Sequence, residues 1–481
     1  MRAVNVSKNI ADWAWKYVPL AGVMTMASYV LAKEILAPTG RTVKVLVLFL
    51  VLVILLRFEM VFSLYMFVVL FPFPSGIALT STNVVFLTLI ALLWVVRAHS
   101  ANIPLFTRTD LDKYIWFYLA AFIVSFFNVE PGYFAQSLKL LWLELAVIAY
   151  CYLIVRFVDD ENKLATFTRL IAVSSGLLAL TGLLQLVAPT SDLIPGWINV
   201  RSPGELGQRV EGVRLTGAVA SHSVLSDYSV IGMFFMTLHL IRTRNPITRT
   251  VWLGMLAMTF FVTLATGNRG AFLSMLIGIL YSGYVFRRHL SLGRVIIVGS
   301  LFMALLIGAE IAIRKHSYAV SVTQRVTETT FEKGIPNNRA GAWIPALKGS
   351  LDHIFIGHGP YYDTGTGLDK KAWPHNSYIF VLYTFGIFGL IAFLLVRYKL
   401  FRISLAYRSP AAQGTFTGTV LAICNILLLV RLAAIGRTDF QRPADYVSVF
   451  FVWMIFGLTL ACANIVKERK AKLARNTVSA P

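Results

Sequence analysis

Charged residues are scarce in this sequence, and their scarcity excludes a water-soluble protein. They make up 14% of the 481 residues, whereas hydrophobic residues make up 57%. A soluble domain typically has about a quarter of its residues charged, and it cannot bury this much apolar surface. No soluble domain, low-complexity tract or clear internal repeat separates the apolar runs. The solvent around most of the chain must therefore be lipid.

Cysteines are few, and the sequence lacks clusters of acidic residues. The three cysteines, Cys151, Cys424 and Cys462, lie inside apolar runs, so they cannot staple an external loop, and they lack metal-site spacing. Asp363 and Asp369 lie in a loop without a paired carboxylate cluster, so we expect no metal and no other cofactor. The first residues lack a short apolar core followed by a small-residue cleavage site, so no cleaved signal peptide is expected.

Apolar runs of membrane-spanning length are abundant. A helix needs about 20 apolar residues to cross the hydrocarbon core of a bilayer. We therefore predict an all-α fold, a polytopic membrane helix bundle of about 12–14 transmembrane helices with two long outer-face loops. The candidate spans lie near residues 17–37, 42–57, 59–77, 81–97, 113–129, 134–156, 167–188, 222–242, 249–267, 270–286, 294–313, 376–397, 414–434 and 445–466.

The basic residues predict the orientation of these spans. Lys and Arg number 44 against 23 Asp and Glu, for a net charge of +21. An excess of basic residues in cytoplasmic loops explains this charge, so no nucleic-acid partner is expected. One assignment puts every basic loop and both termini in the cytoplasm, and it leaves loops 189–221 and 314–375 on the outer face. The basic groups are Arg97/Arg108/Lys113, Arg156/Lys163, Arg242/Arg244/Arg249, Arg287/Arg288/Arg294, Arg397/Lys399/Arg402/Arg408 and the tail Lys467–Arg475.

Three outer-face arginines run against this charge bias. Arg214 lies at the membrane boundary, Arg269 lies in a tight glycine-flanked turn, and Arg339 begins an amphipathic stretch. A guanidinium holds phosphate oxygens bidentately and stays charged, so we predict that these arginines contact a substrate phosphate. For Arg269 the alternative is a helix-end arginine that extends to lipid head groups.

Two further arginines lie in the first long outer loop. Arg201 and Arg209 have an equally good explanation in ion pairs with Glu205 and Glu211, or in contacts with lipid phosphates. We keep Arg209 as a candidate substrate-binding residue. Because loops longer than about 12–15 residues are usually functional or disordered, the two long outer loops are where function is expected.

His375 is the candidate proton acceptor. It precedes an apolar span, and an unperturbed histidine titrates near pH 6.5, so it can accept a proton from a hydroxyl at physiological pH. The alternative is a helix-start histidine bonded to backbone or water, but the neighbouring Asn376 and Tyr378 favour a site. We predict that Asn376 and Tyr378 bind substrate. His222 and His358 are weaker candidates, and His222 is assigned to substrate binding.

Two charges fall inside the span 134–156. Lys139 and Glu144 are five residues apart, which places them on different faces of a helix, so each needs a partner on another helix. Intramembrane charges are costly and are candidates for function. We interpret both as members of structural ion pairs.

The stretch from Arg339 to Gly389 resembles the O-antigen ligase family of bacterial inner-membrane glycosyltransferases, which includes O-oligosaccharyltransferases and exopolysaccharide polymerases. The family's motif is His, then Asn, Ser or Gln, nine residues, Gly, two residues, and Gly, Thr or Tyr. Here it is His375-Asn376, then Gly386 and Gly389. Arg214 and Arg269 resemble the family's other outer-face arginines. Four residues after Arg339 the ligases have Leu, whereas this chain has Trp343.

The resemblance implies a division of the chain and a reaction. Residues 1–166 would be N-terminal transmembrane helices, 167–398 the ligase-like catalytic region, and 399–481 C-terminal helices with a basic cytoplasmic tail. The implied activity transfers a glycan from undecaprenyl pyrophosphate to an acceptor hydroxyl at the periplasmic face, without metal. The implied catalytic residues are His375, Arg339, Arg269 and Arg214.

The acceptor stays open between two classes. A polymerase would use a lipid-linked glycan, and a ligase would use lipid A-core; Trp343 slightly favours polymerisation. The other partners would be membrane lipids. The alternative from another class is a polytopic transporter or flippase of lipid-linked glycans, although transporters usually show internal repeats and broken helices near the bilayer midplane.

Overall fold

The apolar runs form helices throughout the part of the chain that the structure describes. Every predicted span from residue 59 onward corresponds to a helix, whereas the runs near 17–37 and 42–57 lie outside the described residues. The computed structural model describes residues 59–70, 72, 81–187, 192–194, 198–199, 214–219, 221–287, 291–315, 321–327, 337–360, 376–433 and 446–478.

The described elements are almost all helices. A two-stranded antiparallel hairpin, β1 (Asp192–Ile194) and β2 (Ile198–Asn199), lies between α7 and α8. The α-helices are α3 (Met60–Leu70), α4 (Ser81–Ser100), α5 (Asp112–Val124), α6 (Phe134–Phe157), α7 (Glu161–Val187), α8 (His222–Arg242), α9 (Pro246–Ala265), α10 (Arg269–Val285), α11 (Leu292–Lys315), α12 (Val322–Val326), α13 (Asn337–Ser350), α14 (Ser377–Ser404), α15 (Phe416–Ala433) and α16 (Tyr446–Val478). Short 3-10 turns are η1 (Ser125–Asn128), η2 (Pro131–Tyr133), η4 (Gly217–Val219) and η8 (Leu405–Arg408).

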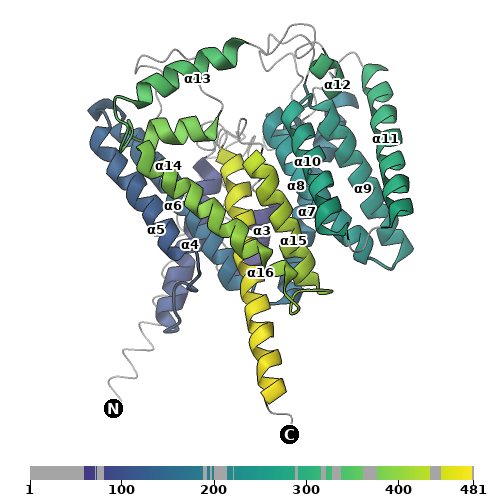
Figure 1. The fold of residues 1–481 in the computed structure, drawn as a ribbon, viewed down its shortest axis with the longest axis horizontal. Helices are drawn as coiled ribbons and strands as arrows, with labels where there is room; N and C mark the ends of the chain where they lie inside the picture. Colours follow the sequence, from purple (N-terminus) through teal and green to yellow (C-terminus); the bar gives the residue numbers. More distant parts are fainter. Residues whose placement is uncertain are drawn as a thin grey trace, which may run out of the picture.

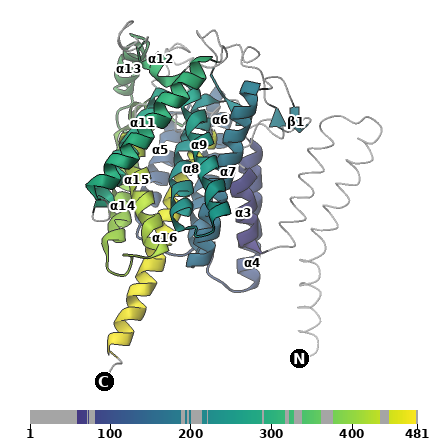
Figure 2. The ribbon, with the colours of Figure 1, turned by 90° about the vertical axis from the view of Figure 1, so that its right-hand side faces the viewer.

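The long helices stand side by side as a bundle, and α13 lies across one end of it (Figure 1). We call this the site end, because α8, α10 and α14 also begin there. The C-terminal part of α16 projects from the opposite end, which we call the tail end (Figures 1 and 2). Among the described residues, seven helices are long and apolar enough to cross a membrane, which confirms the multi-pass all-α fold.

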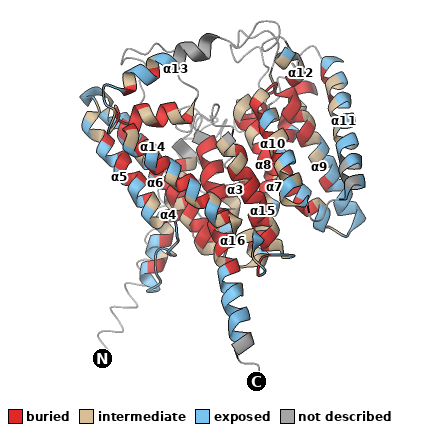
Figure 3. Ribbon diagram, in the orientation of Figure 1, coloured by how far each residue is buried: buried red, intermediate tan, exposed pale blue. Residues whose placement is uncertain are grey.

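Burial shows which helices form the centre of the bundle. In the most apolar stretch of α16, 94% of residues are buried, against 33% for α4 and for α9 (Figure 3). The side chains that α4 and α9 expose include Leu92, Val95 and Leu253. A surface with such apolar side chains is stable in lipid rather than water, so α16 is the core helix and the outer helices face the bilayer.

Several of the basic segments that were predicted to share one side lie together at the tail end. Lys467 in α16 is 2.7 Å from Asp110, and Arg469 is 3.0 Å from Glu161 at the start of α7. Arg242 at the end of α8 donates to Thr419 in α15 at 3.2 Å. These contacts join α16 to the segment around Asp110 and to α7, and they join α8 to α15. That this end faces the cytoplasm stays a prediction of the positive-inside rule.

The predicted span 376–397 lies within a stretch long and apolar enough to cross a membrane, but it is not one straight helix. Gly386 has φ 65° and ψ −167°, so the chain reverses there within α14. The Tyr378 and Phe393 rings lie 6.0 Å apart, although 15 residues of straight helix would separate them by about 22 Å. We call Ser377–Phe385 the short arm and the rest of α14 the long arm.

The reversal also changes the place of Arg397. The sequence assigned this arginine to a basic cytoplasmic loop, but it is only 9% exposed and lies inside the bundle. It is one full turn and more from the end of α14, because the helix continues to Ser404. After the break at Gly386 a second helical stretch, the long arm, runs toward the tail end. The residues after Arg397 form its last turns, and Arg397 itself lies deeper in the bundle.

Candidate functional site

The reversal in α14 is held by the segment 351–360, which docks against it. The main-chain N–H groups of His358 and Gly359 donate to the carbonyls of Tyr383 and Thr384, both at 2.9 Å. In return, the N–H of Ile387 donates to the carbonyl of Ile354 at 2.7 Å. A break in a helix leaves backbone groups without intrahelical partners, and this segment supplies them.

Two glycines make this close approach possible. A Cβ on Gly386 would lie 2.3 Å from the backbone of Phe355, and a Cβ on Gly357 would lie 2.3 Å from the backbone of Thr384. Both glycines have positive φ, which side-chain-bearing residues rarely adopt. Gly386 is the first glycine of the histidine motif, so its position in the motif has a structural reason: the short arm folds back there.

His358 has a structural role rather than the weaker catalytic role considered from the sequence. Its Nε2 lies 2.8 Å from the carbonyl oxygen of Gly349, and its ring stacks on Tyr383 with centroids 4.2 Å apart. Burial lowers the pKa of His358 below its ordinary value, partly offset by the bond to Gly349. The neutral imidazole therefore links α13 to the short arm of α14.

Asn376 begins the short arm. Its side-chain oxygen accepts from the N–H groups of Tyr378 and Ile379, at 3.0 and 3.3 Å, as an N-cap. The second position of the histidine motif thus fixes where the helix starts, directly after the histidine. Tyr378 is half-buried, with its ring edge against Phe393. His375 itself lies outside the described residues.

The structure describes only part of the remaining predicted arginines, Arg339, Arg201 and Arg209. Arg339 lies in α13, which packs on α14, and Trp343 of the same helix packs against the hydrophobic core. The structure describes the backbone of Arg339 but not its side chain. Arg201 and Arg209 lie outside the described residues.

Arg214 and His222 meet at the start of α8. Arg214 Nη1 lies 2.8 Å from His222 Nε2. The segment after Arg214 is fixed by α7, because the side-chain oxygen of Gln185 accepts from the N–H groups of Thr216 and Gly217, both at 2.9 Å. A buried side chain of α7 therefore holds the backbone that follows Arg214, and the structure brings Arg214 and His222 together, two residues that the sequence predicted separately.

The turn that precedes α10 packs on the same part of α8. Asn268 donates to the Ser226 hydroxyl at 2.5 Å, one helical turn beyond His222. Gly267 has φ 60°, as the tight turn requires. Arg269 follows directly as the first residue of α10 and is partly buried. Arg214 and Arg269 thus belong to two segments that contact the first two turns of α8.

Sequence reasoning missed two arginines inside the bundle. Arg431, near the end of α15, forms a 3.0 Å ion pair with Asp227 on α8, and their side chains are only 13% and 16% exposed. Arg397 on the long arm lies within electrostatic range of Glu144 on α6. The signal for Arg431 was its position inside the predicted span 414–434, since charges in spans are costly.

The same contacts decide the interpretation of the charges on α6. Glu144 is 3% exposed and has a cationic neighbour on another helix, as expected. Lys139 is exposed, so the structure gives it no buried environment of the kind that Glu144 has. The costly charge on this helix is the carboxylate.

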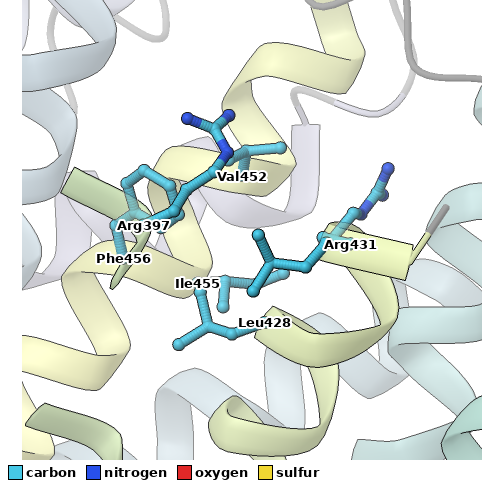
Figure 4. Close-up of a pocket in the computed structure, with 7 residues that line it drawn as sticks. Arg397, Leu428, Arg431, Val452, Ile455 and Phe456 are labelled. Carbon is cyan, nitrogen blue, oxygen red and sulfur yellow. The ribbon is translucent and has the colours of Figure 1, made fainter. Parts of the chain in front are cut away.

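Arg397 and Arg431 line one pocket between α14, α15 and α16 (Figure 4). Both side chains extend to the same side of an apolar floor made by Leu428 and Ile455. The Arg397 guanidinium lies over the Phe393 ring, 3.2 Å from its centroid. That ring also contacts Tyr378, so the pocket is connected to the first turn of the short arm.

Comparisons with known proteins agree with this arrangement. Residues 253–394 match the sequence model of the O-antigen ligase family, a stretch that contains the α9–α10 turn, segment 351–360 and the reversal at Gly386. In this stretch the chain is similar to the O-antigen ligase family. A curated O-antigen ligase from Salmonella typhimurium (strain LT2) is 25% identical over 259 residues, which is 51% of this chain. The match spans 60% of the length of that relative.

The family match does not cover the whole site. It includes Arg269, Asn376 and both motif glycines, whereas Arg214 with His222 precedes it and Arg397 with Arg431 follows it. The matched stretch contains the histidine motif, in which Asn376 and Gly386 have structural roles in this chain. The contacts of Arg397 and Arg431 are established by the structure alone.

Proposed function

We propose that this protein is a glycosyltransferase of surface polysaccharide synthesis. It moves a glycan from undecaprenyl pyrophosphate to an acceptor hydroxyl, at the periplasmic face of a bacterial inner membrane. One observation carries the proposal: the reversal at Gly386 and the cap at Asn376 fix a helix start directly after His375. That start lies at the end of the bundle where Arg214 and the Arg269 turn also gather.

In the proposed reaction, the acceptor oxygen attacks the anomeric carbon of the donor glycan. A new glycosidic C–O bond forms, and the bond between that carbon and the pyrophosphate oxygen breaks. His375 takes the proton from the attacking hydroxyl, and the polyprenyl pyrophosphate departs with the electron pair. A positioned proton acceptor typically contributes about 10²–10⁴-fold to a rate.

The arginines stabilise the departing diphosphate. Arg214, Arg269 and Arg339 are assigned to its oxygens because a fixed guanidinium offers paired donors and a permanent charge. Loss of one preorganised donor to a developing anion costs on the order of 10²–10³ in rate. The Gln185 side chain accepts from the backbone N–H groups of Thr216 and Gly217, and this fixing of the segment after Arg214 is the kind of support that such preorganisation needs.

The transporter alternative gains one supporting observation, since α14 is a broken helix and transporters commonly use broken helices. Here the backbone groups freed by the break are bonded to segment 351–360. In a transporter such groups line a substrate cavity instead. The docked segment therefore favours the enzyme.

The test uses purified protein in liposomes with defined lipid-linked repeats, with and without lipid A-core, followed by sizing of the products. Longer lipid-linked chains identify a polymerase, and glycosylated lipid A-core identifies a ligase. His375→Ala is expected to abolish product while lipid-linked glycan still binds. His99→Ala, at an exposed position near the tail-end terminus of α4, is the matched control. Normal product formation by His375→Ala would remove this histidine from the mechanism.

A further inference from the structure

The pocket between Arg397 and Arg431 lies between the two halves of the candidate site. On one side, Arg431 pairs with Asp227 at 3.0 Å, and Asp227 follows Ser226, which accepts from Asn268 in the Arg269 turn. On the other side, Arg397 lies on Phe393, whose ring meets Tyr378 of the short arm. The pocket thus connects the arginine cluster on α8 with the helix that begins after His375.

The lining of this pocket combines charge with apolar surface. Leu428, Leu432, Val452, Ile455 and Phe456 line it together with the two arginines. Its free volume of about 10 Å³ holds about one water-sized atom. A single oxygen of a phosphate group has that size, and the adjoining apolar side chains suit the hydrocarbon chain of a lipid.

Among the residues that the structure describes, the contacts of Arg431 do not use its full donor capacity. A guanidinium has five N–H donors, and the contact of Arg431 with Asp227 uses Nη1. Each arginine also has a carboxylate in its surroundings, Asp227 for Arg431 and Glu144 for Arg397. A phosphate oxygen in the pocket would compete with Asp227 for Arg431.

We infer that Arg397 and Arg431 form a second lipid-phosphate subsite, which takes a phosphate oxygen of the acceptor lipid. The inference rests on the proposed function for the identity of that lipid. Arg214, Arg269 and Arg339 are assigned to the donor diphosphate, so a separate pair of arginines on the other side of Asp227 suits a second phosphate-bearing substrate. A polyprenyl-linked acceptor, which a polymerase uses, places its phosphate next to a hydrocarbon chain as the pocket requires.

The test measures binding of undecaprenyl phosphate to the full chain in phosphatidylcholine nanodiscs, with lipid A as a parallel probe. Arg397→Gln and Arg431→Gln are each expected to raise the Kd for undecaprenyl phosphate on the order of 10–100-fold, because each removes a charge-assisted contact. Arg249→Gln, at an exposed position on the tail-end turn of α9, is the matched control and leaves the Kd unchanged.

Two variants separate a ligand site from a structural ion pair. Asp227→Asn is expected to lower the Kd several-fold, because the phosphate no longer competes with a carboxylate for Arg431. If the pair of Asp227 and Arg431 serves only to join α8 to α15, the two variants Asp227→Asn and Arg431→Gln have the same effect on the Kd: both raise it, or neither changes it. Either result overturns the inference. Leu428→Phe fills the pocket with both arginines kept, so it tests the site even if an arginine variant fails to fold.

The two probes identify the source of the phosphate. A response of undecaprenyl phosphate binding supports the polyprenyl-linked acceptor, and a response confined to lipid A overturns it in favour of a lipid A acceptor. Glycan transfer is measured on the same wild-type preparation. If the Kd values change as expected but the wild-type protein transfers no glycan, the proposed function is refuted and the subsite stands. If the wild-type protein transfers glycan but the arginine variants leave the Kd unchanged, the subsite is refuted and the proposed function stands.

Discussion

Gly386→Ala is the substitution that most directly tests how the site is built. The new methyl group would lie 2.3 Å from the carbonyl carbon and oxygen of Phe355 and 2.5 Å from the nitrogen of Ile356. These are backbone atoms, so no side-chain rotation relieves the clash. The conformation at residue 386, φ 65° and ψ −167°, is in addition one that is essentially restricted to glycine and costs other residues on the order of 1–3 kcal/mol.

The clash is relieved only if segment 351–360 moves away from α14. That movement breaks four main-chain hydrogen bonds, from His358, Gly359, Ile387 and Phe388, at about 1 kcal/mol net each. Adding the backbone strain gives a destabilisation of about 5–7 kcal/mol for the docked reversal. The short arm then loses its fixed position, and transfer activity is expected to fall to background.

The assay combines thermal unfolding in detergent, limited proteolysis within 351–360, and the transfer reaction in liposomes. Gly283→Ala in α10 is the control, because a Cβ there meets nothing within 4 Å, and alanine favours a helix by about 0.5–1 kcal/mol. Gly357→Ala approaches the same interface from the other side, so its effect should not add to that of Gly386→Ala. Wild-type unfolding and activity for Gly386→Ala would refute the reversal as the device that positions His375.

Two further predictions concern residues next to this reversal. Asn376→Ala removes the N-cap and should lower stability by about 1 kcal/mol together with activity, whereas Asn376→Ser keeps both; unchanged thermal unfolding of the alanine variant would leave only a substrate contact for Asn376. Burial lowers the pKa of His358, so the contribution of this residue to docking is present above its ordinary pKa near 6.5 and is lost as the pH falls below it. Hydrogen exchange of segment 351–360 should therefore accelerate between pH 7.5 and pH 5.5, and His358→Gln should abolish that dependence.

The membrane bundle followed from the sequence because lipid burial depends on local composition. A run of about 20 apolar residues becomes a helix wherever it lies, since its backbone groups must bond within the segment. The basic loops at 108–113, 156–163 and 242–249 were grouped correctly for the same reason. The positive-inside rule likewise depends only on the few residues next to the end of each span.

The reversal at Gly386 could not be derived in that way. Glycine occurs inside many apolar helices, and at Gly254 and Gly283 the chain stays helical. What makes Gly386 different is the backbone of Phe355, which lies 31 positions earlier and replaces the lost helical hydrogen bonds. The spacing of the histidine motif singled out Gly386 in the sequence, but it did not predict the positive φ at which the helix breaks.

The sequence by itself determined that this chain is a bundle of apolar helices, and it predicted that arginines and a histidine gather in the loops at one end. Tertiary structure alone decided that Arg397 lies inside the bundle, that Asp227 holds Arg431, and that Asn376 caps a short reversed arm. The physical reason is that hydrophobic burial is set by local composition. The partners of a buried charge or a broken helix come from distant segments, and only packing brings them together.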